Sequence, residues 1–385
     1  MSPQKPQKLM IGFRCFFLIV LAGFYVPSLL SQDSLSVTRP ILHMDVKNDG
    51  NKSNFFLMLT YPDGRKLDSI QETYSPAWSP DGSVFAYITA KGENLRVRDF
   101  AGKEKDLLNV GGHQELVPRI AWSPDGKSIA LLSLTTGERG PDRCALVVVD
   151  VTRAISRSVC LIPEGVVHIP GYTSPFNNLR WSRDGLKILI SWESAAVIDV
   201  ATGRLDTISS QPVIAEWGTT SKAVYFLPLE HYNEREMTFG GFSLYNVESK
   251  AISVVNDARL VASYGLRPKG ITLGNLSMSP SYSKFMIVGG SWPVGRPDTI
   301  RLYSVADKEP LRIDRPLKSF KSDEAIAEVD WSPDEKFLTA LTLSKDGVSL
   351  KVLDLANGEW KTIGTIALKS TDIEIFIHKL LSWSR

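Results

Sequence analysis

The chain has 385 residues, of which 43% are hydrophobic and 22% are charged, so it can bury a large core and is not a disordered protein. This length fits either two or three average domains or one large all-β domain. The formal net charge is +2, and basic and acidic residues are interspersed without a basic run, which argues against a nucleic-acid partner.

Residues 1–31 have the composition of an export segment. The first 14 residues contain Lys5, Lys8 and Arg14 and no acid, and the apolar run CFFLIVLAGFYVPSLL follows over residues 15–30. This run is shorter than the roughly 20 residues that cross a bilayer as a helix. We expect a cleaved signal peptide, or alternatively a retained membrane anchor, that delivers residues 32–385 to the periplasm or another extracytoplasmic compartment.

A repeated unit begins after an opening stretch, residues 35–72, that is typical of β-strands. The segment AWSPDGSVFAYIT at residues 77–89 returns 44 residues later as AWSPDGKSIALLS and, more diverged, as RWSRDGLKILISW. The residue at the Trp position of each unit, which we name the anchor, recurs at intervals of 36 to 61 residues. The anchors are Trp78, Trp122, Trp181, Trp217, Met278, Trp331 and Trp383.

The pattern within each unit predicts a β-propeller. Each anchor precedes a turn, an alternating apolar strand, a second strand that ends in a polar turn, and often a third strand. Four strands with a period of this size are typical of a propeller blade. Residues 35–72 lack an anchor and the last residues supply one without outer strands, so the two chain ends should share a blade. We predict an all-β, seven-bladed propeller over residues 32–385, with six blades as the alternative because the Met278 unit is degenerate.

The Ser-Pro-Asp-Gly corner after the anchor indicates a turn and not a catalytic motif. Pro presets φ and Gly accepts positive φ, which suits a type I turn followed by a left-handed residue. The carboxylates of this corner, in Asp81, Asp125, Asp184 and Asp334, are therefore expected to hold turns. The anchor Trp is expected to fill the wedge between blades and to bury on the order of 200 Å².

The corner, the alternating strand and the "vvDv-tG" turn together resemble the TolB-like propeller repeat, also described as a WD-like repeat. The resemblance is strong over residues 75–205 and 325–360 and weak over 206–324. This family includes the periplasmic protein TolB and the propeller domains of prolyl-oligopeptidase-type enzymes. It implies a propeller and envelope-associated protein partners, and it carries no partner-binding residue over to this chain because only the fold motif matches.

Cys144 and Cys160 flank a short polar connection centred near Thr152. Residues equidistant from the centre of a hairpin face each other with Cβ atoms about 4.5–5.5 Å apart, which is close to what a disulfide requires. We therefore predict a Cys144–Cys160 disulfide. The alternative is that both are small buried hydrophobic residues with free thiols.

Motifs for catalysis are scarce in this sequence. It has no Gly-x-Ser-x-Gly elbow and no residues left over for a hydrolase domain, so serine peptidase activity is not expected. The residues that precede the anchors line the channel of a propeller, and Glu216 and Asp330 with Asn275 are candidate ligands for a hard cation such as Ca²⁺. A plain ion pair with Arg180 is the alternative role for these acids.

Two long connections are candidate partner-binding surfaces. Residues 229–241 are polar and include His231 and Arg235, and residues 289–299 contain Trp292 and Arg296 between glycines and prolines. Aromatic and Arg side chains on scaffolded loops are typical interface hot spots. Trp292 covering a blade edge is the alternative.

We interpret the sequence as a non-catalytic interaction or scaffold module of the cell envelope that presents propeller loops to a protein or peptide. The alternatives are a metal-dependent propeller enzyme of the lactonase or lyase type that uses the channel acids, and a propeller that binds a sugar or another small ligand.

Overall fold

The computed structural model describes residues 41–49, 52–60, 65–71, 73–89, 92–136, 143–163, 178–191, 194–232, 236–239, 241–256, 260–263, 276–281, 283–290, 298–304, 316–332, 334–344 and 347–366. The predicted export segment (residues 1–31) and Trp383 lie outside these residues. The described residues include no helix that is long and apolar enough to cross a membrane.

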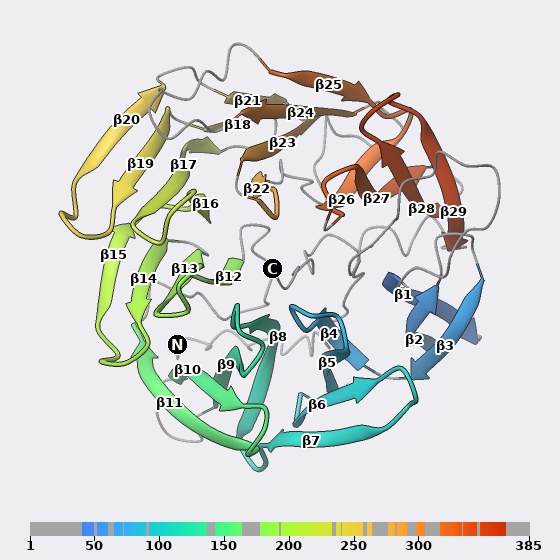
Figure 1. Ribbon diagram of the computed structural model, residues 1–385, viewed down its shortest axis with the longest axis vertical. Helices are drawn as coiled ribbons and strands as arrows, with labels where there is room; N and C mark the ends of the chain where they lie inside the picture. The colour runs from blue at the N-terminus through green and yellow to red at the C-terminus, as the bar shows by residue number, and fades with distance from the viewer. Residues whose placement is uncertain are drawn as a thin grey trace, which may run out of the picture.

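Seven antiparallel sheets are arranged in a ring about a central axis, as Figure 1 shows. The first three sheets contain β1 (Ile41–Asp49), β2 (Lys52–Thr60) and β3 (Lys66–Gln71); β4 (Thr73–Trp78), β5 (Val84–Thr89), β6 (Asn94–Asp99) and β7 (Glu104–Asn109); and β8 (Gln114–Trp122), β9 (Ser128–Thr135), β10 (Arg143–Asp150) and β11 (Ile155–Ile162). The chain is therefore a seven-bladed, all-β propeller, and the six-bladed alternative is wrong.

The remaining four blades continue the ring in chain order. They contain β12 (Asn178–Trp181), β13 (Lys187–Ser191), β14 (Ala195–Asp199) and β15 (Leu205–Ser209); β16 (Val213–Trp217), β17 (Ala223–Tyr232), β19 (Phe242–Asn246) and β20 (Ile252–Asn256), extended by β18 (Glu236–Phe239) and β21 (Leu260–Ser263); β22 (Leu276–Met278), β23 (Lys284–Gly290), β24 (Asp298–Ser304) and β25 (Lys318–Lys321); and β26 (Ala325–Trp331), β27 (Phe337–Ser344), β28 (Gly347–Asp354) and β29 (Trp360–Ile366).

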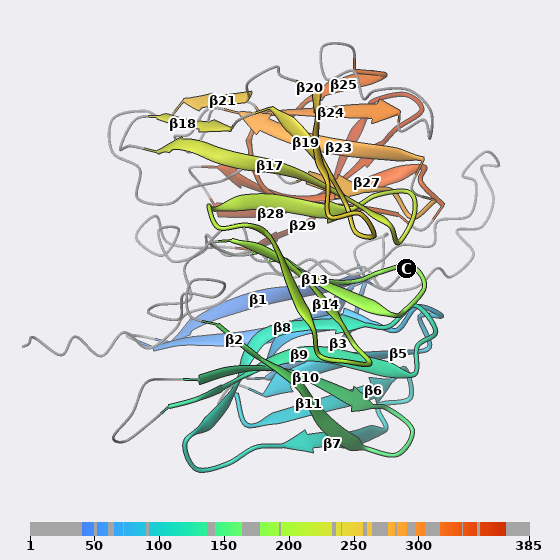
Figure 2. The same cartoon turned by 90° about the vertical axis from the view of Figure 1, so that its left-hand side faces the viewer.

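The anchored strands β4, β8, β12, β16, β22 and β26 lie nearest the central axis (Figure 1). Because successive strands run antiparallel, the first and third connections of each blade lie on one face of the ring, which we name the turn face. The second connection and the link to the next blade lie on the opposite face. Figure 2 shows the ring from the side, with the strands running between these two faces.

The corner motif forms the predicted turn. The carbonyl of Ser79 accepts a 2.8 Å hydrogen bond from the Gly82 amide, and the Ser79 hydroxyl donates to Asp81 at 2.6 Å. Gly82 has φ +64°, a left-handed conformation that glycine adopts without strain. The structural interpretation of the repeated Asp is confirmed at this corner, because its carboxylate is an acceptor within the turn.

The anchor tryptophans tie neighbouring blades together. Each described anchor is buried, and the indole Nε1 of four of them donates to the carbonyl of the residue that precedes the anchor in the blade before. The pairs are Trp122 with Ala77 at 2.9 Å, Trp181 with Ala121 at 2.9 Å, Trp217 with Arg180 at 3.1 Å and Trp331 with Ser277 at 3.4 Å. The predicted wedge is therefore also a hydrogen-bonded link.

The N-terminal sheet has three strands in the described part of the chain, β1 to β3. This agrees with the prediction that residues 35–72 are outer strands. The predicted closing strand around Trp383 lies outside the described residues. Trp78, the anchor of the following blade, has a buried Nε1 without an acceptor among the described residues.

The predicted Cys144–Cys160 disulfide is absent, because both residues are free cysteines in the structure. A bulge between Leu146 and Val147 shifts the register, so that Cys160 pairs with Leu146 and Cys144 with Ile162. The expectation of directly opposed cysteines assumed a regular hairpin centred on Thr152. The pairing of Asp150 with Ile155 already moves the partner of Cys144 by one position, and the bulge moves it by one more, so the two cysteines are diagonal neighbours. Burial raises the pKa of the Cys144 thiol to about 12.

Candidate binding groove on the turn face

A groove of about 780 Å³ opens on the turn face between the β8–β11 blade and the β12–β15 blade. One wall comes from the corner at residues 123–128 and from the β10–β11 connection, and the other from the corner at residues 181–186 and from Val200. The volume falls within the range of about 300–1,000 Å³ that is typical of ligand sites. We name it the turn-face groove.

Two exposed aliphatic side chains line this groove. Ile155 is 62% exposed and Leu186 is 58% exposed, and they lie on opposite walls. Below them Val148, Val200 and Trp181 are buried and form apolar lining. An exposed aliphatic side chain is common on its own, but two over an apolar base form a surface that can bury apolar area.

Both aliphatic residues occupy repeat positions that lack a large aliphatic side chain in the other blades whose connections are described. Leu186 follows the corner Gly, where the first two anchored blades have Ser83 and Lys127. Ile155 follows the residue with positive φ in the third connection, where one other blade has Ala251 after Lys250 and three others have charged residues. These are Lys103 after Gly102, Arg204 after Gly203 and Glu359 after Gly358. The repeat therefore does not require either aliphatic side chain.

The three carboxylates that line the groove are acceptors within their own turns. Asp125 accepts from the Ser123 hydroxyl at 2.6 Å and from the Lys127 amide at 3.0 Å. Asp184 accepts from the Ser182 hydroxyl at 2.6 Å and from the Leu186 amide at 3.0 Å. Asp150 accepts from the backbone amide of Arg153 at 2.8 Å. These bonds fix the groove walls.

The pKa values of the two corner acids agree with this role. The hydroxyl of Ser123 holds the pKa of Asp125 below its ordinary value. Burial acts to raise the pKa of Asp184, but the hydrogen bonds from Ser182 and Leu186 outweigh it, so that this pKa is also lowered. Both carboxylates are therefore ionised at neutral pH and are poor general acids.

Two guanidinium groups on the same wall lack carboxylate partners in the described part of the chain. The guanidinium of Arg157 donates to the carbonyl of Val200 at 2.9 Å and so reaches the neighbouring blade. Arg153 lies in the connection before β11, and its side chain makes no ion pair with a described residue. Arg157 and Ile155 alternate along β11 and project on the same side of the sheet.

The channel candidates form local pairs. The Arg180 Nε lies 3.6 Å from the Glu216 carboxylate, and both side chains are largely buried. Glu216 also accepts from the Trp217 amide at 3.0 Å, and Asp330 accepts from the Trp331 amide at 2.8 Å. Each acid thus accepts a hydrogen bond from the backbone amide of the anchor that follows it.

No group of three or more His, Cys, Asp or Glu side chains that could hold a metal occurs among the described residues. Asn275, the third member of the predicted cation site, lies outside them. A Ca²⁺ site at Glu216 and Asp330 stays a prediction, and the ion pair with Arg180 is the arrangement that the geometry supports.

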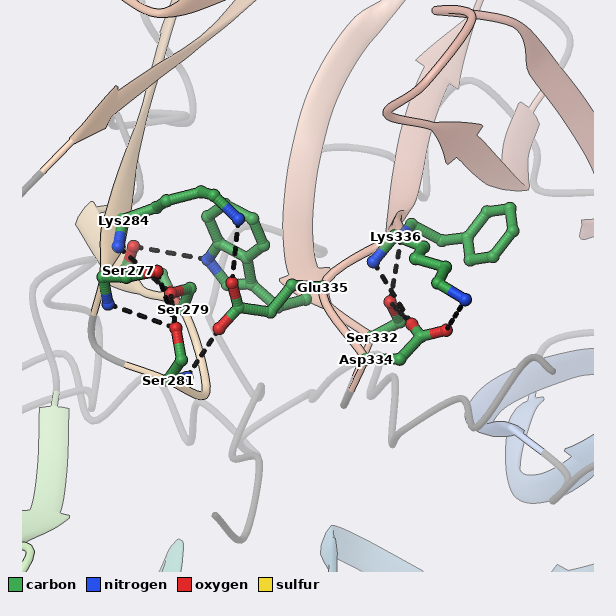
Figure 3. Close-up of polar contacts among 11 residues, drawn as sticks. Ser277, Ser279, Ser281, Lys284, Ser332, Asp334, Glu335 and Lys336 are labelled. Carbon is green, nitrogen blue, oxygen red and sulfur yellow. Dashed lines mark hydrogen bonds and ion pairs between the residues drawn. The ribbon is translucent and has the colours of Figure 1, made fainter. Parts of the chain in front are cut away.

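A second polar cluster on the turn face joins the β22–β25 and β26–β29 blades (Figure 3). Glu335 occupies the corner position that is Gly in other blades, at φ +56°. Its carboxylate accepts from the Ser281 amide at 2.6 Å and from the Lys284 ammonium at 3.0 Å, both in the blade before. A Cβ at the equivalent Gly126 would lie 3.5 Å from Pro80 of the blade before. Side chains at this position therefore point to the preceding corner.

The hydrogen bonds of Glu335 control its ionisation. Burial acts to raise the pKa of Glu335, but the contacts with Ser281 and Lys284 outweigh it and leave this pKa below its ordinary value. The Ser281 corner has lost the usual Asp, and the carboxylate of Glu335 supplies an acceptor to it from the next blade. This cluster is a structural link between blades.

The predicted loop surfaces have different outcomes. Residues 229–241 were expected to be a polar connection, but β17 continues to Tyr232 and pairs with β18, where His231 lies opposite Thr238. The prediction of a loop there is wrong, because this connection adds strands β18 and β21 to its sheet. Arg235, Trp292 and Arg296 lie outside the described residues, so their proposed role in partner binding stays a prediction.

Sequence reasoning missed the turn-face groove. Its residues come from two blades and from positions that are unremarkable within a single unit. The available signal was the occurrence of Ile155 and Leu186 at repeat positions where other units have no large aliphatic residue.

No protein-family model and no curated protein matches this chain. The TolB-like repeat therefore stays a resemblance. Among solved structures, an oligogalacturonate lyase from Vibrio parahaemolyticus has a TM-score of 0.54 at 11% identity and covers 88% of this chain and 91% of its own. An acylaminoacyl peptidase from Pyrococcus horikoshii has a TM-score of 0.55 at 13% identity and covers 90% of this chain, which spans only 52% of that protein.

TolB from Acinetobacter baumannii is similar at a TM-score of 0.41 and 12% identity, over 85% of this chain and 80% of its own. At identities this low, the first two structures show the β-propeller fold and nothing finer.

Proposed function

We propose that this protein is a non-catalytic interaction module that binds a protein or peptide partner in the turn-face groove. The observation that carries the proposal is the pair of exposed aliphatic residues, Ile155 and Leu186, at repeat positions that are polar or, in one blade, alanine elsewhere in the described ring. They face one groove, next to two arginines without carboxylate partners in the described structure. Arg is enriched at interface hot spots, and exposed aliphatic side chains gain free energy when a partner buries them.

The construction of the groove supports binding better than chemistry. Its carboxylates are turn acceptors with lowered pKa values, so they are not poised to transfer protons at neutral pH. Its walls are fixed to their neighbours: the Asp184 amide donates a hydrogen bond to the Ser221 hydroxyl of the next blade at 3.0 Å. A preorganised surface of this kind reduces the conformational cost of binding.

We further propose that the module acts in the cell envelope. This part of the proposal rests on the basic and apolar composition of residues 1–31. The intact mass of the protein isolated from its native cells tests it, because export with cleavage removes about the first 31 residues and a retained anchor leaves them. Full-length protein recovered from the cytoplasm would contradict this location.

Site-specific crosslinking tests the binding surface. A photoreactive amino acid is placed at position 186 of the full-length chain in the native cells, and at position 143 as the matched control. Arg143 begins β10, whose other end, Asp150, lines the groove, so the control sits on the opposite face of the same blade. We expect a protein adduct from position 186 that is absent from position 143.

The substitution Ile155→Glu should abolish the adduct, because it places a charge in the apolar part of the groove. Thermal unfolding of the Ile155→Glu protein checks that the fold survives, as expected for a 62% exposed side chain. Failure to form an adduct at position 186, or equal adducts from both positions, would refute the proposed surface.

A further inference from the structure

We infer that the turn-face groove recognises an acidic, extended peptide segment in which a carboxylate lies next to an aliphatic side chain. This inference rests on the proposed function and names the ligand class of the same site. It follows from the charge that the groove leaves unpaired and from the spacing of its side chains.

The groove lining contains three arginines, Arg153, Arg157 and Arg183, and the three aspartates described above. Neither Arg153 nor Arg157 has a carboxylate partner in the described part of the chain, whereas Asp125, Asp150 and Asp184 are each bound by donors of their own turns. Asp125 also has the Lys127 ammonium 4.0 Å away. The aspartates already accept hydrogen bonds in their own turns, so the guanidinium donors of Arg153 and Arg157 are the charged groups left for a ligand, and a carboxylate matches the fork of a guanidinium.

The spacing on β11 fits an extended peptide. Ile155 and Arg157 are two residues apart on one side of the strand, which places their Cα atoms about 6.5–7 Å apart. Side chains of an extended ligand repeat at the same interval. One ligand residue can then pack between Ile155 and Leu186 while the second residue along presents its carboxylate to Arg157, with Arg153 beside it.

The aliphatic walls favour a peptide over an acidic sugar. A sugar ring lying over Ile155 and Leu186 would bury hydroxyl groups against aliphatic surface without hydrogen bonds, which costs free energy. An aliphatic or aromatic side chain of a peptide gains by the same burial. The groove thus combines one charged and one apolar determinant at the spacing of a polypeptide.

The test uses fluorescence polarisation with the full-length chain in detergent. The probes are a labelled peptide of alternating leucine and glutamate and a matched peptide with glutamine in place of glutamate. We expect the acidic peptide to bind at least tenfold more tightly. The double variant R153Q/R157Q should lose that tenfold preference, and raising the salt concentration should weaken binding of the acidic peptide selectively.

Two control variants separate charge from packing. R143Q removes an Arg from the other end of β10 and should leave both affinities unchanged. The double variant I155S/L186S should weaken both peptides by a similar factor, because it removes the apolar determinant and keeps the arginines. Unchanged thermal unfolding shows that each variant is folded.

The outcomes distinguish the ligand class from the proposed function. Equal binding of the two peptides, or tighter binding of an oligogalacturonate probe that competes with them, overturns the acidic-peptide assignment. If a crosslinked partner forms at position 186 but neither peptide binds, the ligand class is wrong and the interaction surface stands. If the acidic peptide binds wild type and R153Q/R157Q alike, Arg153 and Arg157 are not the recognition groups.

Discussion

Replacing Trp122 with Phe should lower the free energy of unfolding by about 2–4 kcal/mol. The Trp122 indole donates to the Ala77 carbonyl of the neighbouring blade at 2.9 Å, and both residues are buried. Removing the donor from a buried carbonyl costs about 1–3 kcal/mol. Truncation of a buried aromatic to Ala costs about 3–5 kcal/mol, so trimming an indole to a phenyl ring adds on the order of 1 kcal/mol.

The matched control is Trp360→Phe. The Trp360 indole also donates to a backbone carbonyl at 2.9 Å, that of Lys321, but this bond is exposed to solvent. Water replaces the lost partner there, so the expected cost is below about 1 kcal/mol. Urea unfolding followed by far-ultraviolet circular dichroism measures both variants. A Trp122→Phe loss no larger than that of Trp360→Phe would refute the importance of the link between blades.

Three further predictions concern ionisable groups. The pKa of Glu335 is lower in the folded protein than its unfolded value of about 4.3, so the ionised carboxylate stabilises the fold above that pH and the contribution is lost in acid. The urea midpoints of wild type and E335Q should therefore differ at pH 7 and converge as the pH falls below about 4. Burial raises the pKa of Asp298 to about 6, so protonation favours the folded state. The free energy of unfolding of the wild type should therefore fall by about 2–3 kcal/mol as the pH rises from about 4 to about 6. D298N should remove this pH dependence, and an unchanged pH dependence in D298N would contradict its assignment to Asp298. Cys160 is only partly buried and should be alkylated in the native protein, whereas Cys144 is buried, has a pKa raised to about 12 by burial, and should react only in denaturant. An intact mass lacking two hydrogens would instead show a disulfide.

The fold was predictable because each blade repeats the same local solution. The Ser-Pro-Asp-Gly corner specifies a turn through the fixed φ of Pro and the positive φ of Gly, and Gly82, Gly126 and Gly185 all adopt it. The anchor Trp is large and apolar, so its burial between blades also follows from its chemistry. These features act within one unit, and one unit can be interpreted without knowing its neighbours.

Features that depend on two blades were not predictable in this way. The acceptor of the Trp122 indole lies in the preceding blade, and nothing within the unit of Trp122 indicates it. The carboxylate of Glu335 serves a corner 54 residues earlier. The offset of the cysteine pair by two positions likewise combines two features outside the local pattern, the turn that pairs Asp150 with Ile155 and the one-residue bulge at Leu146.

The link from indole to carbonyl also bears on how the ring closes. Four anchors donate to the residue before the preceding anchor, and the buried Nε1 of Trp78 lacks an acceptor among the described residues. If the pattern continues, its acceptor is the carbonyl of Ser382, the residue before the predicted anchor Trp383. Deleting residues 367–385 would then expose the Trp78 indole and lower the urea midpoint, and Trp78→Phe would cost little more in that truncated chain. A large additional loss would place the acceptor elsewhere.

The same regularity gives a criterion for finding function in a repeat fold. A side chain that the repeat requires is explained by the fold, as the corner Asp is by its turn. Leu186 and Ile155 are not required, because Ser, Lys, Arg, Glu or Ala occupies the equivalent positions in the other described blades. Each leaves an aliphatic side chain more than half exposed, which offers no benefit to folding. Because both departures fall on one groove, a common ligand accounts for them more simply than two independent accidents of sequence.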